Sequence, residues 1–597
     1  MSNSLFRTKN IDKILKDAAT NEEAAHGGAG ALKRVLTVKD LTFFGIAAII
    51  GAGSFSSLGQ ACFNGGPGVV ILFIICAVAC GFTALCYSEF ASRIPVAGSA
   101  YTYAYASFGE LFAWIIGWAL IMEYSIGNIY VAFSWSDYFT SFLTRIGVHI
   151  PDYFTCSYME AHEAVIANVG VPLSQLTTST KELLNAWSSA PMIGGLRIIF
   201  DLPALIICVL ITTLVYIGVK ESRNFSNVMV ILKLCIIVLV IAVGAYYVNP
   251  DNWLPVNSAG VKSFMPNGFS GVMRAVSGVF FAYIGFDAIS VMAEESKNPQ
   301  RDLPRSMILS LVICTVVYIL LTLVLTGVVS YEKFNNVGDP LAKIFEDTNV
   351  GWMQFLVSLA AVIAMTSVLL VFQMGQPRIW MSMSRDGLLP PLFQKIHPKF
   401  KTPSFSTIIT GLVVGVPLLF TDKVFVLDFT SIATLFAFVL VCGGVLLIPR
   451  KEKVAGRFNI PFINGKYIFP LLIVCSIISI FFLVKNQLGN NYFRELLNGD
   501  LKDYSNSPLN NKLLFSNASL KISTIIFWMI LIVLSIISFM KNLSLIPMLG
   551  LTFCLYLLTG MTGKNWVWFA TWLLLGLIIY FLYGYRKSKL AIQTRFA

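Results

Sequence analysis

The sequence consists largely of apolar runs of about twenty residues, the length that an α-helix needs to cross the hydrocarbon core of a membrane. Charged residues make up only 12% of the chain, against roughly a quarter in soluble domains. We therefore predict an all-α polytopic membrane protein with about fourteen spans. The spans cover approximately residues 41–62, 67–91, 111–143, 199–219, 224–248, 271–293, 306–330, 352–381, 405–421, 426–448, 467–485, 521–540, 543–562 and 565–585.

The distribution of basic residues predicts the orientation of the chain. Residues 1–40 are polar and charged without a continuous apolar core, so we expect no cleavable signal peptide. Lys and Arg residues gather in alternate loops, for example at Arg450, Lys451 and Lys453. An even number of spans with the positive loops inside places both termini in the cytoplasm. The net charge of +12 then reflects topology and contact with anionic lipid, and we expect no nucleic-acid partner.

These boundaries divide the chain into four predicted parts. Residues 1–40 form a cytoplasmic segment that is partly amphipathic, and the stretch from Ile11 to Leu41 has the pattern of a surface helix. We expect a ten-helix transport core over 41–450, four additional transmembrane helices over 451–585 and a cytoplasmic tail over 586–597.

Two of the apolar runs are interrupted near their middle. The first contains "FFGIAAIIGAGSF", residues 43–55, and the sixth contains "FFAYIGFDAIS", residues 280–290. Each interruption alone is also explained by close packing of helices through small residues. Together they fall at the openings of two five-span halves, and interrupted helices at corresponding positions of two repeats indicate the binding site of a transporter.

An unwound helix offers binding groups of both signs. The backbone N–H groups at the start of its second half attract an anion, and the carbonyl groups at the end of its first half attract a cation. A zwitterionic amino acid carries one group of each kind. The interruption near Gly51, Ala52 and Gly53 therefore predicts a site for such a substrate.

Three ionisable residues interrupt apolar stretches and need a role, because a charge within a membrane is costly and usually functional. These residues are Glu123 in "WIIGWALIMEYSIG", Lys233 in "NVMVILKLCIIVLVIAV" and Asp287 in the sixth run. Burial disfavours the charged form of a lysine, so Lys233 either forms a structural ion pair or loads and releases a proton. Glu123 is a candidate partner for Lys233 or for a basic substrate.

Several longer stretches resemble the amino acid–polyamine–organocation (APC) superfamily, and within it the cationic amino acid transporter (CAT) family. The resemblance runs through "LKRVLTVKDL", "IGAGSF", "YSEFASRIPVAGSAYTYAY", "GVKESRNFSNVMVILKL", "FFAYIGFDAIS", "EESKNPQRDLPRS", "GQPRIWMSMSRDGLLP" and "NWVWFATWLLLGLIIYFLYGYRKS". It implies the leucine-transporter fold, with a 5+5 inverted repeat whose helices 1 and 6 are broken, alternating access, and additional C-terminal helices.

The resemblance also implies roles for individual residues. The substrate carboxylate would meet the amides of Gly51, Ala52 and Gly53. Its amine would meet the carbonyls of Ile49, Phe281 and Ile284. Asp287 would lie at the side-chain end of the pocket, and Lys233 would carry a proton where sodium-coupled relatives hold a cation. Many family members carry an acid where this chain has Ala119, which weakens an inference of selectivity for cationic substrates.

The sequence thus predicts a secondary active transporter that imports L-amino acids, cationic or small neutral, by proton symport across the plasma or inner membrane. An exchanger or facilitator without proton coupling is an alternative, and a non-transporting sensor is a further one. We expect no enzyme activity, because the chain lacks HExxH, P-loop and GxSxG motifs in a suitable setting. We expect no cofactor and no metal. The partners would be the L-amino acid, protons and the lipid bilayer, with room for a small accessory membrane subunit.

Overall fold

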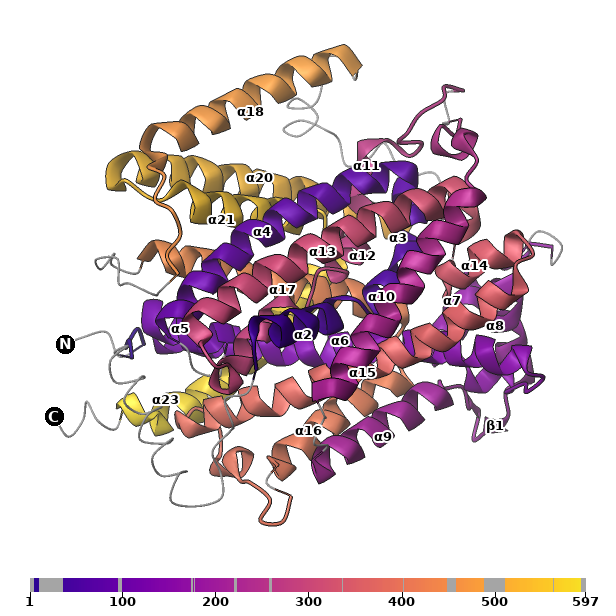
Figure 1. The fold of residues 1–597 in the computed structure, drawn as a ribbon, viewed down its shortest axis with the longest axis horizontal. Coiled ribbons are helices and arrows are strands. Elements are labelled where there is room, and N and C mark those ends of the chain that lie inside the picture. The colour runs from indigo at the N-terminus through magenta and orange to yellow at the C-terminus, as the bar shows by residue number, and fades with distance from the viewer. Residues whose placement is uncertain are drawn as a thin grey trace.

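The computed structural model describes residues 5–9, 36–94, 99–172, 176, 178–218, 223–256, 260–335, 337–400, 402–447, 458–487, 510–561 and 563–591. Most of these residues belong to helices that run between two ends of the molecule (Figure 1). Helices α5 and α23 lie at one end, and helices α7, α8 and α14 lie at the other (Figure 1). We call the second end the far end.

The first group of helices begins with an interrupted one. Thr37 caps its first part, because the Asp40 carboxylate accepts hydrogen bonds from the Thr37 backbone N–H at 3.0 Å and from the Thr37 hydroxyl at 2.6 Å. The main helical elements of this group are α2 (Val38–Ile49), η1 (Gly53–Ser57), α3 (Leu58–Gly65), α4 (Val69–Arg93), α5 (Ser99–Ser107), α6 (Glu110–Arg145), α9 (Leu202–Ile217) and α10 (Arg223–Tyr246).

The second group again begins with an interrupted helix. Its elements are α11 (Gly268–Arg274), α12 (Val276–Phe281), η6 (Phe286–Glu295), α13 (Pro299–Val328), α14 (Pro340–Asp347), α15 (Gly351–Arg385), α16 (Ser404–Gly415) and α17 (Lys423–Leu447). The remaining helices are α18 (Gly465–Gln487), α20 (Asn510–Lys541), α21 (Leu545–Leu558), α22 (Gly563–Ile579), η10 (Tyr580–Gly584) and α23 (Tyr585–Lys587).

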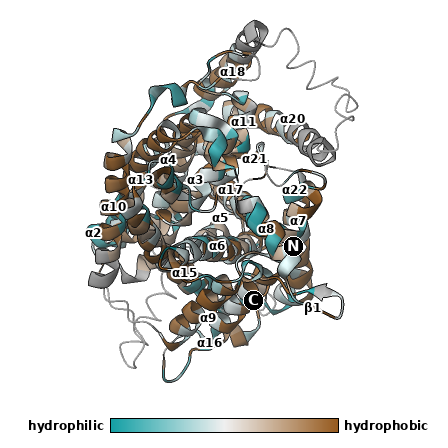
Figure 2. Cartoon of the chain, turned by 90° about the vertical axis from the view of Figure 1, so that its right-hand side faces the viewer, coloured by the Kyte–Doolittle hydropathy of each residue, from teal (hydrophilic) through white to brown (hydrophobic). Residues whose placement is uncertain are grey.

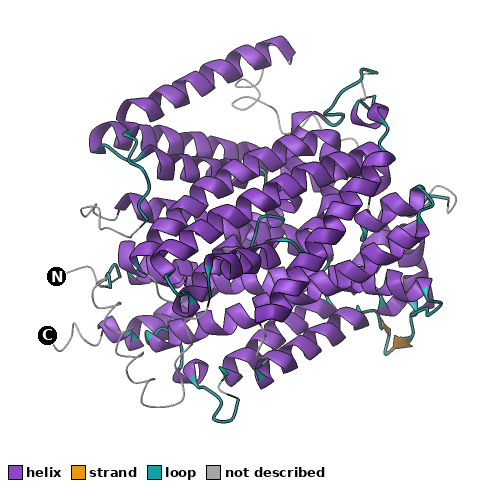
Figure 3. Cartoon of the chain, in the orientation of Figure 1, coloured by secondary structure: helices purple, strands orange, loops and turns teal. Residues whose placement is uncertain are grey.

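The far end carries short elements between α6 and α9. They are η3 (Asp152–Phe154), α7 (Tyr158–Ala167), α8 (Thr178–Ser189) and a hairpin of two two-residue strands, β1 (Met192–Ile193) and β2 (Leu196–Arg197). In this hairpin Met192 pairs with Arg197, and no other sheet occurs within the described residues (Figure 3). The prediction of an all-α class is confirmed apart from this hairpin.

The core is a continuous set of buried apolar side chains around α6. This helix packs against α15 and α17, while α13 packs against α2 and α4. The peripheral helices turn apolar residues outward, and α9, α13 and α16 are strongly hydrophobic in Figure 2. Leu210 in α9, Val312 in α13 and Leu412 in α16 are examples of exposed apolar side chains. Such a continuous apolar surface is typical of a protein surface in contact with the hydrocarbon core of a membrane.

Most described residues of the expected apolar runs are helical, apart from the interruptions at 50–52 and 282–285. Eight helical segments of the described chain are long and apolar enough to cross a membrane, and shorter apolar helices accompany them. The chain is therefore a multi-pass membrane protein. The surface helix predicted over Ile11 to Leu41 lies mostly outside the described residues, and α2 begins only at Val38.

Candidate functional site

The first interrupted helix breaks where the sequence places its glycines. Helix α2 ends at Ile49, and Ile50 is extended with φ −81° and ψ 98°. The chain resumes as a π-helical turn at Gly53, and the Gly51 carbonyl accepts the backbone N–H of both Ser54 and Phe55 at 3.0 Å. The predicted break is confirmed. It leaves the last carbonyl groups of α2 and the first N–H groups of the next segment without partners in their own helix.

The second interrupted helix breaks in the same manner. Helix α12 ends at Phe281, and Gly285 has φ +117°, a conformation that favours glycine. The chain then continues as the 3₁₀ segment η6 from Phe286. This predicted break is also confirmed.

The two breaks lie against each other. A Cβ added to Gly53 would stand 2.5 Å from the Ala282 Cα atom, and one added to Gly285 would stand 2.9 Å from the Ala48 Cβ atom. Only glycine allows such close approach of the two backbones. The glycines therefore serve both to unwind the helices and to bring the two unwound segments together.

A small cavity lies between the breaks. Its volume of about 10 Å³ has room for about one water molecule. The lining combines residues of both breaks with apolar side chains of α6 and α15. They are Ala48, Ile49, Gly51, Ala52, Gly53, Val131, Phe281, Ile284, Val368 and Phe372. An amino acid fits here only if the apolar side chains around the cavity move aside.

The structure brings together six of the residues singled out from the sequence. Ile49, Gly51, Ala52, Gly53, Phe281 and Ile284 all line the cavity. The Ile49 carbonyl already accepts a hydrogen bond from the Tyr318 hydroxyl at 3.0 Å, which leaves its second lone pair.

Sequence reasoning missed Ala48, Val131, Val368 and Phe372. Each sits in a locally apolar stretch of its helix, where nothing in the sequence separates a pocket residue from a core residue.

Lys233 lies next to the first break. It is only 1% exposed, and its ammonium group donates to the carbonyl oxygens of Ala47 and Ile50, each at 2.9 Å. A third hydrogen bond, at 3.3 Å, reaches the Ser367 hydroxyl of α15. All three acceptors are neutral oxygens, and Lys233 forms no ion pair with any described carboxylate. The carbonyl end of a helix attracts a cation, which explains this placement.

Asp287 is 1% exposed and does not line the cavity. Its carboxylate accepts backbone N–H groups at the start of η6, including those of Gly285 and Ala288, but its Oδ2 atom has no partner. Glu123 on α6 is equally buried, and its Oε2 atom also has no partner. The two carboxyl groups interact electrostatically with each other, and Glu123 does not contact Lys233 in the described structure.

A buried carboxyl group without a cation is neutral, hydrated or a ligand for a positive group. The pair of Glu123 and Asp287 can therefore hold a proton or receive a cationic substrate group. In the described residues no cluster of His, Cys, Asp and Glu is suited to a metal ion.

Comparison with known sequences identifies the family of the chain. The family model described as amino acid permease matches residues 36–494, and a model of the C-terminus of the same family matches residues 543–588. The branched-chain amino acid permease BcaP of Bacillus subtilis is 35% identical over 99% of this chain and 100% of its own length.

Two further relatives widen the range of named substrates. A methylthioribose transporter of Bacillus subtilis is 39% identical over 77% of this chain and 89% of its own length. The vacuolar cationic amino acid transporter 2 of Arabidopsis thaliana is 30% identical over 98% of this chain and 93% of its own length.

Proposed function

We propose that this chain, which belongs to the amino acid permease family, imports L-amino acids together with protons by alternating access. Its relatives support amino acid transport, and family membership indicates a transporter and not an enzyme. The observation that carries the proposal is the meeting of two unwound helices at a closed cavity in the middle of an apolar helix bundle.

The unwound segments offer the groups that a zwitterion needs. The substrate carboxylate would accept the N–H groups of Gly51, Ala52 and Gly53, where the helix dipole favours negative charge. The substrate amine would donate to the carbonyls of Ile49, Phe281 and Ile284. Because both sets of groups come from the backbone, they bind the part that all L-amino acids share and leave selectivity to the side-chain end.

The cavity wall favours a small neutral side chain. Val131, Val368 and Phe372 present only apolar surface, and the relative BcaP is named for branched-chain amino acids. A cationic substrate is the second candidate, because Glu123 and Asp287 are both buried, interact electrostatically and each have an unpartnered oxygen. The two candidates differ in whether the substrate reaches that carboxyl pair.

Lys233 is the proposed proton carrier. In its charged form it ties the end of α2 to α15 through the Ala47 and Ile50 carbonyls and the Ser367 hydroxyl. Loss of the proton removes one donor and the positive charge, so the hold on α2 weakens. The proton is taken up from the outer side and released to the cytoplasm, and movement of α2 links that release to opening of the inner side. Glu123 is a second candidate for this relay.

The proposal includes an architecture and an orientation. Residues 41–450 would form two inverted five-helix repeats opening with α2 and α11–α12, and residues 451–585 four additional helices. By the positive-inside rule the termini would face the cytoplasm, and the far end would be the outer face of a cell membrane. Lipid surrounds the bundle, and the outward apolar helices leave room for a small accessory subunit.

Uptake into proteoliposomes tests this function. Radiolabelled alanine, leucine, arginine and lysine are each measured with and without an inward proton gradient. Accumulation of alanine or leucine above equilibrium, only with the gradient, is expected. Uptake that ignores the gradient but rises with internal amino acid would replace symport by exchange, and binding without uptake would favour a sensor.

A further inference from the structure

A cation lies directly above the outer wall of the cavity. Phe281 lines the cavity, and the Tyr130 ring packs edge-on against it with centroids 4.7 Å apart and an interplanar angle of 68°. The Lys423 ammonium stands 5.6 Å from the centroid of the Tyr130 ring. A cation at this distance is attracted by the face of an aromatic ring. We call Tyr130, Asp137, Phe281 and Lys423 the roof.

Carboxylates on two other elements hold Lys423 in place. Its ammonium forms an ion pair with Asp137, which lies two turns after Tyr130 on α6. Its backbone N–H donates to Glu160 Oε1 of α7 at 3.2 Å. The first residue of α17 is thereby tied to α6 and α7, and the roof joins elements that are distant in sequence.

The loop before α14 closes against the same helix. A Cβ at Gly338 would stand 2.6 Å from Asp137 Oδ2, and the Ser56 hydroxyl donates to the Gly338 carbonyl at 3.0 Å. The first interrupted helix and this loop therefore meet beside the Lys423–Asp137 pair.

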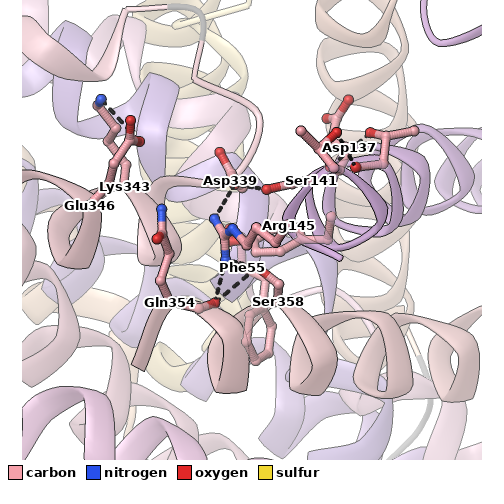
Figure 4. A network of polar contacts seen from close by, with 12 residues as sticks. Phe55, Asp137, Ser141, Arg145, Asp339, Lys343, Glu346, Gln354 and Ser358 are labelled. Carbon is pink, nitrogen blue, oxygen red and sulfur yellow. Dashed lines mark hydrogen bonds and ion pairs between the residues drawn. The ribbon is translucent and has the colours of Figure 1, made fainter. Parts of the chain in front are cut away.

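A second set of contacts fixes the same loop to α6. The Ser141 hydroxyl donates to Asp339 Oδ2 at 3.0 Å (Figure 4). Arg145 approaches Asp339 at 3.9 Å and donates to the Gln354 carbonyl at 2.6 Å and to the Ser358 hydroxyl at 2.8 Å. Arg145 thus bridges α6, the loop and the start of α15.

The Lys423–Asp137 pair lies between water and the Tyr130 ring. The side chain of Lys423 is 16% exposed and that of Asp137 is 30% exposed. Burial opposes the charge on Lys423, but the Asp137 carboxylate and the Tyr130 ring outweigh it and raise the pKa of Lys423 above its ordinary value. Lys423 is therefore a permanent cation at physiological pH. Removing one partner of a partly buried pair leaves the other charge uncompensated.

We propose that Lys423 is the positioning residue of the outer gate: it holds Tyr130 against Phe281 and thereby keeps the cavity closed to the outside. The inference rests on the proposed function, because it assumes that the cavity binds the transported amino acid. Loss of the Lys423 charge frees Tyr130 to turn away from Phe281, and the cavity opens more often toward the outer face.

Thiol labelling of a cysteine placed in the cavity tests the roof. Val131→Cys replaces a lining residue by one of similar size, and a membrane-impermeant maleimide is added outside sealed vesicles that hold the full chain. Labelling of the protein without this substitution gives the background from native cysteines. Lys423→Met is expected to raise the rate of labelling at position 131 by about tenfold.

Three further variants separate a gate from a general structural effect. Lys423→Arg keeps the charge and should keep the slow rate. Asp137→Lys combined with Lys423→Asp restores an ion pair with its signs exchanged but places a carboxylate over the Tyr130 ring, so labelling should stay as fast as in Lys423→Met. Lys262→Met removes the ammonium of the exposed pair Lys262–Asp251, 64% and 79% exposed, and should change nothing.

The outcomes also separate this proposal from the proposed function. An unchanged labelling rate in Lys423→Met, with a size-exclusion profile that shows folded protein, would contradict the proposal that Lys423 keeps the outer gate closed. A faster rate in Lys262→Met as well would overturn it too. Failure of the wild-type protein to accumulate any amino acid would contradict the proposed function but leaves the labelling comparison of the two lysines intact.

Discussion

Two lysines in this protein differ in the oxygens that surround them. Lys233 is enclosed at the end of α2 and donates only to neutral oxygens, the carbonyls of Ala47 and Ile50 and the Ser367 hydroxyl. Lys423 lies at the far end and faces the carboxylates of Asp137 and Glu160. The partners, and not the residue type, decide what each lysine can do.

Neutral acceptors bind an ammonium without fixing its charge. A carboxylate stabilises the charged form directly, whereas a carbonyl can also accept from a neutral amine. Lys423 is therefore a fixed cation suited to hold a gate closed. In the proposed mechanism Lys233 loses its proton, and the contacts of its charged form also hold the end of α2.

Restoring the helix at the first break has the largest expected effect. Gly53→Leu would drive a side chain into the Ala282 backbone, since a Cβ already stands 2.5 Å from the Ala282 Cα atom. We expect the loss of measurable leucine binding by scintillation proximity, because the two unwound segments separate. Gly351→Leu, at an exposed position where an added Cβ meets no atom within 4 Å, is the matched control. Normal leucine binding by Gly53→Leu would contradict the claim that the two unwound segments form the binding site.

Giving Lys233 a carboxylate partner would make it resemble Lys423. Ser367→Asp places an acid where a hydroxyl now accepts from Lys233 at 3.3 Å. An opposite charge at this distance holds the ammonium in its charged form, and we expect proton-driven uptake to fall about tenfold.

Ser367→Asn is the control for that substitution, because it has nearly the same shape and no charge. The initial rate of gradient-driven uptake is measured for both variants. Equal rates for Ser367→Asp and Ser367→Asn would show that the charge of the partner does not affect uptake. That result would contradict the explanation of the difference between the two lysines.

Asp287 should matter through the second break. Its carboxylate accepts the N–H groups of Gly285 and Ala288, so Asp287→Ala leaves the start of η6 uncapped. We expect the affinity for leucine to fall about fivefold by equilibrium binding, because a lost cap costs about 1 kcal/mol. Asp287→Asn retains one acceptor and should lose less. Wild-type affinity in Asp287→Ala would remove this residue from the site.

The smallest expected effect is a pH dependence of stability that arises from Asp339, which lies among the contacts at the far end. Burial raises the pKa of Asp339 to about 6 from an ordinary 3.8. Asp339 faces Arg145, Asp137 and Tyr138 of α6 and Glu346 of α14.

Between these two pKa values the native state of Asp339 holds a proton that the unfolded state releases, so stability falls as pH rises through this window. The melting temperature in detergent is measured at pH 4 and pH 7 for the wild type and for Asp339→Asn. The advantage of the wild type over the variant should shrink by a few degrees at the higher pH. An advantage that grows with pH would reverse the sign and refute the assignment.

The helices and their interruptions could be predicted from the sequence because they depend on local composition. A run of twenty apolar residues or a Gly-Ala-Gly triplet acts on its own segment. The ends of α2 and α12, at Ile49 and Phe281, lie where this reasoning expects them.

The partners could not be predicted, because they come from distant segments. Lys423 and Asp137 are 286 residues apart, and Lys233 and Ala47 are 186 apart. Glu123 was a plausible partner for Lys233 by charge, but in the structure Lys233 donates to backbone carbonyls. Every residue carries a backbone carbonyl, so the sequence does not indicate which ones accept. Sequence therefore identified the charged residues and left their environments undetermined.

The central claim is that Lys233 carries the coupled proton, and one comparison tests it most directly. Lys233→Met and the wild type are reconstituted at equal density, and leucine accumulation under an inward proton gradient is measured beside leucine exchange with no gradient. We predict that the variant exchanges leucine at a rate within a few-fold of the wild type but no longer accumulates it. Accumulation by Lys233→Met that still follows the proton gradient would contradict the account.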